Sequence, residues 1–80
     1  MVNMEIKDFI EKIIEQFQDY TGVMITSETV MRDLYEWDSL TGMAVLSMIQ
    51  DELNAPVPDE DFTKAKTIGE LYDLMIKYRK

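Results

Sequence analysis

A serine at the predicted start of a helix is the residue of this sequence best placed to carry chemistry. Ser39 follows Asp38 in the segment Glu36-Trp37-Asp38-Ser39-Leu40. The first N–H groups of a helix lack partners within the helix, and its N-terminus carries roughly half a positive charge. A phosphate attached to Ser39 would be stabilised there. Serine and aspartate are also common helix caps, so the residue types alone leave a purely structural role open.

Side chains suited to other chemistry are few. The chain of 80 residues has no cysteine and no histidine, which removes thiolate ligands, imidazole ligands and the usual general base. The acidic run Asp59-Glu60-Asp61 lacks the alternating ligands, central glycine and terminal glutamate of a calcium loop. We therefore predict no catalytic residues, no metal site and a protein that is not an enzyme.

The net charge of the chain limits the classes of partner that it is expected to bind. Sixteen acidic and eight basic residues give a formal net charge of −8. Such a field repels phosphate backbones and anionic membrane surfaces, and it attracts basic protein patches. The sequence contains neither a long apolar run nor a signal-peptide pattern. We expect a cytoplasmic monomer that binds neither nucleic acid nor membrane.

Hydrophobic spacing predicts the elements on either side of Ser39. Apolar residues three and four apart over Met4–Phe17 predict an amphipathic helix. This helix should stop near Asp19 to Gly22, because glycine readily adopts the left-handed conformation that follows a helix end. The long connection over Val23–Trp37 carries apolar residues that should pin it against the core. A second helix over Asp38–Leu53 follows. Its core-facing residues should lie within one sector of roughly 100°, and they are Gly42, Val45, Leu46, Ile49 and Leu53.

The remaining chain predicts one short helix and one longer helix. Asp59–Phe62 reads as a single turn anchored by Phe62, after the two prolines that end the second helix. The last helix begins with the capping box Thr67-Ile68-Gly69-Glu70. Its apolar stripe consists of Ile68, Leu71, Leu74, Met75 and Tyr78. The sequence thus predicts one all-α domain over residues 1–80, a bundle of three main helices plus one short helix, with a long loop between helices 1 and 2.

In this order and with these spacings the chain resembles the acyl carrier proteins, a family of phosphopantetheine-dependent carriers. The resemblance covers essentially the whole chain. It rests on Asp38-Ser39-Leu40 and the helix after it, the exit Ala55-Pro56-Val57-Pro58-Asp59, Phe62, and the helix start Thr67-Ile68-Gly69-Glu70-Leu71.

The resemblance implies that a phosphopantetheinyl transferase moves a 4′-phosphopantetheine arm from coenzyme A to Ser39. Asp38 would help the transferase to dock. The thiol of the arm would carry acyl groups as thioesters and present them to acyl-loading and acyl-transfer enzymes of a fatty-acid or specialised, polyketide-type pathway. Two alternatives stay open: an aminoacyl or peptidyl carrier, and a helical interaction module in which Ser39 is only a cap.

The outward face of the second helix departs from the family. Acids are expected two and five residues after the serine, where this chain has Thr41 and Ala44. An apolar docking surface is one interpretation, in which the partner-docking residues are Glu36, Leu40, Met43, Ala44, Ser47, Met48 and Asp51. In the other, Met43 and Met48 fold back onto neighbouring helices.

Two residues near Ser39 also have two interpretations each. Trp37 either shields the arm or packs on the core, and we favour packing. Gly42 either leaves space for an acyl chain or allows close packing of helices, at a cost of roughly 0.5–1 kcal/mol relative to alanine.

Overall fold

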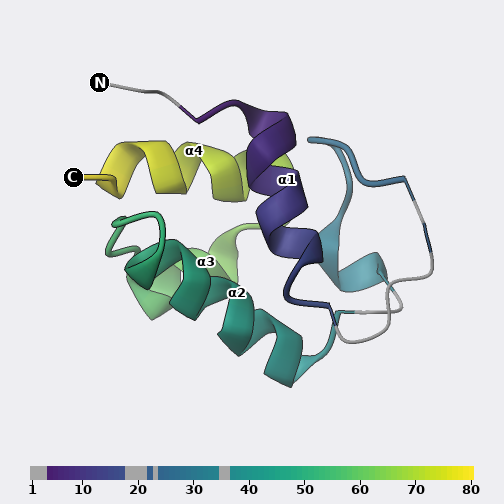
Figure 1. The fold of residues 1–80 in the computed structure, drawn as a ribbon. Coiled ribbons are helices and arrows are strands. Elements are labelled where there is room, and N and C mark those ends of the chain that lie inside the picture. Colours follow the sequence, from purple (N-terminus) through teal and green to yellow (C-terminus); the bar gives the residue numbers. More distant parts are fainter. Residues whose placement is uncertain (1–3, 18–21, 23, 35–36) are drawn as a thin grey trace.

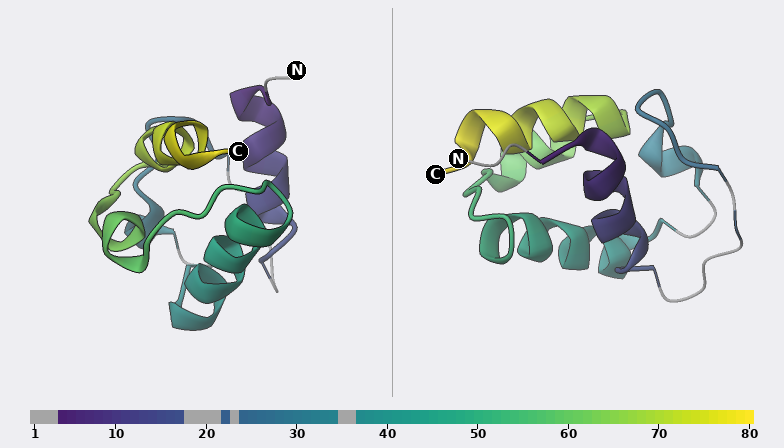
Figure 2. Two further views of the ribbon diagram at one scale, coloured as in Figure 1. Left: turned by 90° about the vertical axis from the view of Figure 1, so that its left-hand side faces the viewer. Right: turned by 45° about the horizontal axis from the view of Figure 1, so that its top comes forward.

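Four α-helices and one 3₁₀ turn make up this computed structural model, which describes residues 4–17, 22, 24–34 and 37–80. The elements are α1 (Ile6–Ile14), η1 (Met31–Asp33), α2 (Ser39–Asp51), α3 (Asp59–Lys64) and α4 (Ile68–Tyr78). The described residues hold no strand beyond one isolated bridge between Val30 and Thr67. The predicted all-α bundle is confirmed. In Figure 1 and in the right-hand view of Figure 2, α2 and α4 lie on opposite sides of the molecule, and α1 runs from one towards the other.

The core is one cluster to which α1, α2 and α4 contribute their apolar faces. In α1, Phe9 and Ile13 are four residues apart and both fully buried. The Phe9 ring meets the edge of Tyr72 on α4, with 5.5 Å between ring centroids. Full burial of such a side chain contributes roughly 1.5–3 kcal/mol. The other completely buried large side chains are Val45, Ile49, Val57, Ile68, Leu71 and Met75.

The first helix is shorter than its apolar pattern predicts. It ends at Ile14, and the predicted end near Asp19 to Gly22 is wrong. The Gln16 and Phe17 N–H groups bond carbonyls three residues earlier, at 2.9 and 3.0 Å, so the chain tightens and turns. This turn leaves Phe17 buried. Gly22 does adopt a positive φ of 85°, but it lies well beyond the end of the helix.

The connection between α1 and α2 is pinned against the bundle, as predicted. Its residues Ile25, Met31 and Leu34 are buried. Three backbone hydrogen bonds join it to the start of α4. Met31 N–H donates to the Lys66 carbonyl at 3.1 Å, Ile68 N–H to the Thr29 carbonyl at 3.0 Å, and Gly69 N–H to the Ser27 carbonyl at 2.8 Å. Carbonyls of the connection therefore satisfy N–H groups that a helix start leaves unpaired.

The other helices begin close to their predicted positions. Asp38 caps α2, and Thr67 caps α4, where its hydroxyl accepts from Glu70 N–H at 3.1 Å. The Glu70 carboxylate accepts from the N–H of Lys66, one residue before the cap, at 3.0 Å, so the capping box forms in a shifted version. Phe62 on α3 is half-buried.

Gly42 and Gly69 provide a matched pair of stability tests. We expect Gly42→Ala to raise the free energy of unfolding by about 0.5–1 kcal/mol, since alanine is the better helix former. Its methyl group would meet Trp37 at an ordinary contact distance of 3.7 Å. At Gly69 the methyl group would lie 3.0 Å from the Ser27 carbonyl oxygen, so Gly69→Ala should gain less. Urea denaturation measures both, and a larger gain for Gly69→Ala would contradict this account.

Candidate functional site

The helix that carries Ser39 begins at that residue. Asp38 immediately before it is extended, with φ −123° and ψ −178°. Its Oδ1 accepts a hydrogen bond from Thr41 N–H at 2.7 Å, and its carbonyl accepts from Gly42 N–H at 2.9 Å. Ser39 is exposed, and its hydroxyl makes no hydrogen bond within the described part of the chain. The cap thus fixes the backbone at Ser39, and the hydroxyl of this residue is accessible to solvent.

The carboxyl group of Asp38 is held in its ionised form. The hydrogen bond from Thr41 N–H is the largest of the effects that lower its pKa below the ordinary value of 3.8. A lowered pKa means that the cap stabilises the fold at neutral pH and that this contribution is lost as the pH falls below 3.8 and through the folded-state pKa. Near neutral pH, a negatively charged carboxylate therefore lies beside Ser39.

The cap and the charge of Asp38 can be separated by two substitutions. Asn is as good an N-cap as Asp, so Asp38→Asn should keep a melting temperature close to that of the wild type, while Asp38→Ala should lower it. If Asp38 also contacts a modifying enzyme, both variants should slow arm attachment by a similar factor. Thermal melting and the rate of attachment measure the two roles, and equal melting temperatures for both variants would rule out the capping role.

A groove beside Ser39 separates α2 from η1 and α3. Its volume is about 520 Å³. Trp37 lies in its wall, half-buried, and stacks on Phe62 with ring centroids 6.4 Å apart and ring planes at 29°. Trp37 also meets Phe17 edge-to-face at 6.4 Å, so the packing interpretation is confirmed. The lining residues are Met31, Arg32, Trp37, Asp38, Ser39, Gly42, Met43, Leu46, Asp59, Phe62, Thr63 and Ala65.

Sequence reasoning missed the far wall of this groove. The Arg32 guanidinium reaches from η1 to α3, where Nη2 donates to the Thr63 carbonyl oxygen at 3.0 Å. Arg32 and Thr63 belong to elements that are distant in the sequence, so no spacing pattern connects either of them to Ser39. The indole of Trp37 lies over Gly42, at a distance that would leave room for a methyl group there.

The outer face of α2 is narrower than predicted. Leu40 and Met43 are 60% and 67% exposed, and Ser47 and Asp51 are also exposed. Met48 is only 3% exposed and belongs to the core, so its predicted place on an outward docking surface is wrong. Thr41 is buried as well, Ala44 is half-buried, and Leu46, predicted to face the core, is half-buried. Glu36 lies outside the described residues.

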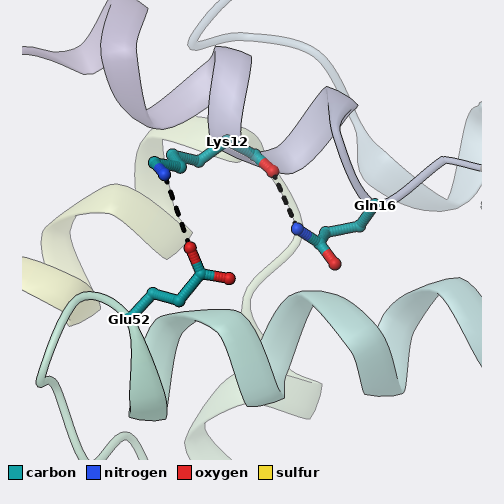
Figure 3. A network of polar contacts seen from close by, with 3 residues as sticks. All are labelled: Lys12, Gln16 and Glu52. Atoms are coloured by element: carbon teal, nitrogen blue, oxygen red, sulfur yellow. Dashed lines mark hydrogen bonds and ion pairs between the residues drawn. The ribbon is translucent and has the colours of Figure 1, made fainter.

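The end of α1 covers the flank of α2 on which Met48 lies. Lys12 of α1 forms an ion pair with Glu52 at 3.4 Å, and Gln16 Nε2 donates to the Lys12 carbonyl at 3.3 Å (Figure 3). Gln16 also lines a shallow hollow with Leu40, Thr41, Met43, Ala44 and Ser47. The buried sector of α2 therefore widens from the predicted 100° to roughly 140°, at 100° per residue.

Other kinds of site find little support among the described residues. They contain no group of three acidic, histidine or cysteine side chains that could hold a metal ion. None of their helices is long and apolar enough to span a membrane.

Comparison with known proteins defines the class. Residues 11–75 match the family model described as a phosphopantetheine attachment site. The chain belongs to this family of carrier proteins, whose domain is the site of covalently attached 4′-phosphopantetheine. A curated acyl carrier protein from Chlorobium phaeovibrioides (strain DSM 265 / 1930) is 29% identical over 77 residues, which cover 96% of this chain and 99% of the relative. No solved structure matches the chain significantly.

Proposed function

We propose that this protein is an acyl carrier whose 4′-phosphopantetheine arm is attached to Ser39. The observation that carries the proposal is the exposed Ser39 hydroxyl, without a hydrogen-bond partner in the described structure, at the first residue of α2 and beside an open groove. The phosphate of the arm would lie at the positive end of the helix dipole. When attached, the arm supplies a thiol that holds acyl groups as thioesters.

The residues around Ser39 fit such a group. The Asp38 cap sets the first turn of α2 and so fixes the backbone position of Ser39 at the helix N-terminus. The groove of about 520 Å³ lies within the roughly 300–1,000 Å³ usual for small-molecule sites. The acidic charge of the chain and its similarity to an acyl carrier protein favour an acyl cargo over an aminoacyl cargo.

Arm attachment tests the proposal directly. The purified protein is incubated with coenzyme A and a broad-specificity phosphopantetheinyl transferase, and its intact mass is measured. We expect the mass to rise by one phosphopantetheine group. No gain with several different transferases would overturn the carrier function and favour a helical interaction module.

The docking surface for the transferase and the acyl-transfer enzymes forms part of the proposal. Leu40, Met43, Ser47 and Asp51 are exposed on the outer face of α2, and Ala44 lies at its margin. Met48 is excluded because it is buried. Two exposed apolar side chains so close to Ser39 favour apolar contacts with the partner over ion pairs.

This surface predicts a mild salt dependence of partner binding. Each buried apolar anchor contributes roughly 1.5–3 kcal/mol, whereas an exposed ion pair contributes roughly 0–1 kcal/mol. Added salt screens only the ion pairs. We therefore expect increasing ionic strength to weaken the binding of an acyl-transfer enzyme to this protein less than its binding to a carrier with acids along this helix. A titration at several salt concentrations measures both losses of affinity. A steep loss of affinity would rule out the apolar mode.

A further inference from the structure

The methionines of this chain differ widely in exposure. The sequence has seven of them and no cysteine, so thioether groups hold all of its sulfur. Among the described residues, Met24 is 82% exposed and Met43 is 67% exposed. By contrast, Met31 and Met48 are only 3% exposed, and Met75 is fully buried. Because a sulfur atom must be accessible to be oxidised, a hydroperoxide in solution reaches Met24 and Met43, while the other three are protected by the core.

Met43 lies between two hollows in the surface beside the attachment site. It is four residues after Ser39, one turn further along the same face of α2. Its side chain lines the groove of Ser39 and also the shallow hollow that Gln16 lines. The exposed Leu40 borders the same hollow. An enzyme that approaches Ser39 over the outer face of α2 therefore contacts Met43.

Oxidation changes the chemistry of this contact. The thioether side chain is apolar and flexible, so it adapts to the surface of a partner. A hydroperoxide transfers one oxygen atom to the sulfur. An S–O bond forms, the O–O bond breaks, the sulfur loses two electrons, and the hydroperoxide proton moves to the leaving oxygen, which departs as water or an alcohol. The resulting sulfoxide is polar and disrupts methionine-rich interfaces, and methionine sulfoxide reductases convert it back to the thioether.

We propose that Met43 is a reversible oxidation site whose sulfoxide weakens the binding of the transferase and of acyl-transfer enzymes. The proposal rests on the proposed function, since these enzymes must dock on the outer face of α2. Met24 provides an internal reference. It lies in the connection before α2 and lines neither the groove nor the hollow, so its oxidation should leave docking unchanged. A hydroperoxide would thus withdraw the carrier from its enzymes, and a reductase would return it.

Peptide mapping by mass spectrometry tests whether Met43 is the accessible site. The apo protein is treated with hydrogen peroxide, the peroxide is removed, and the sulfoxide content of each methionine is followed with time. We expect Met24 and Met43 to be converted fully while Met31, Met48 and Met75 remain unoxidised. Oxidation of Met43 no faster than that of Met48 would overturn the proposal. This measurement uses no transferase and is therefore independent of the carrier function.

The kinetics of arm attachment test the effect on docking. Coenzyme A and a transferase are added to untreated and oxidised wild type, and kcat and KM for the carrier are measured. Oxidation should raise KM about tenfold, as expected for the loss of one apolar anchor. It should leave kcat and the melting temperature unchanged, because Met43 is exposed and its oxidation does not disturb the core.

Two variants assign the effect to one residue. Met43→Leu and Met24→Leu are each compared with their own untreated forms. Peroxide should raise KM in Met24→Leu as it does in the wild type, and it should leave KM unchanged in Met43→Leu, which still contains the exposed Met24. A methionine sulfoxide reductase should restore the KM of the oxidised wild type.

Two results would overturn the switch while leaving the carrier function intact. One is a rise in KM when Met43→Leu is oxidised, and the other is an unchanged KM in wild type whose Met43 is fully oxidised. Untreated wild type that gains no arm with several transferases counts against the proposed function itself, and the effect on docking falls with it.

Discussion

The Ser39→Ala variant is expected to gain no mass on incubation with coenzyme A and a transferase that modifies the wild type. Alanine has no oxygen to which the phosphate could be attached, so the loss should be complete and not merely a lower rate. The helix should remain, because the cap is formed by Asp38 and not by Ser39. Intact-mass spectrometry measures attachment, and circular dichroism checks that the variant is folded.

Ser27→Ala is the matched control. Ser27 is also exposed, but it lies in the connection before α2, outside the groove of Ser39 and outside the docking surface on α2. This variant should be modified fully. An arm that still attaches to Ser39→Ala but is lost in Ser27→Ala would move the attachment site to Ser27 without changing the carrier function.

The Phe9→Ala variant is expected to lose a large part of the stability of the domain. Phe9 is completely buried and packs edge-to-face against Tyr72, whose hydroxyl donates to the Met4 carbonyl. Truncating a buried phenylalanine to alanine costs about 3–5 kcal/mol. A domain of this length has a total stability of only about 4–12 kcal/mol at 0.05–0.15 kcal/mol per residue. Urea denaturation should show a large fall in the midpoint or an unfolded protein without denaturant.

Ile76→Ala provides the comparison for Phe9→Ala. Ile76 lies on α4 and is 43% exposed, so its truncation should change the free energy of unfolding by about 0.5 kcal/mol or less. If Phe9→Ala costs no more than Ile76→Ala, the packing of α1 on α4 is not the main support of the core.

The ends of the helices could be predicted where the signal is local. Asp38 and Thr67 carry cap side chains, and the structure shows both of them capping. The end of α1 has no such signal, since Glu15 and Gln16 are compatible with a longer helix. That helix ends early in a turn that leaves Phe17 against Trp37. A contact between residues so far apart in the sequence cannot be predicted from the spacing of apolar residues.

The candidate site could be predicted only where its residues are close together in the sequence. Ser39 and Asp38 are adjacent in the sequence, and their geometry follows from the start of one helix. The prediction for Met48 failed because a helical wheel describes one helix alone, while burial depends on its neighbours. Here the end of α1 lies over that flank, as the Lys12–Glu52 ion pair shows. Tertiary packing alone reveals Arg32 in the groove wall.

The three backbone hydrogen bonds between the long connection and the start of α4 have a consequence for hydrogen exchange. They tie Ser27–Met31 to Lys66–Gly69, and α2 and α3 form the loop of chain enclosed between these two segments. The closure itself contains no residue of α2, so the first turn of that helix can open locally while these three hydrogen bonds stay intact. The amide protons of Met31, Ile68 and Gly69 report on the closure, and their exchange should stay slow while that of the first turn of α2 quickens.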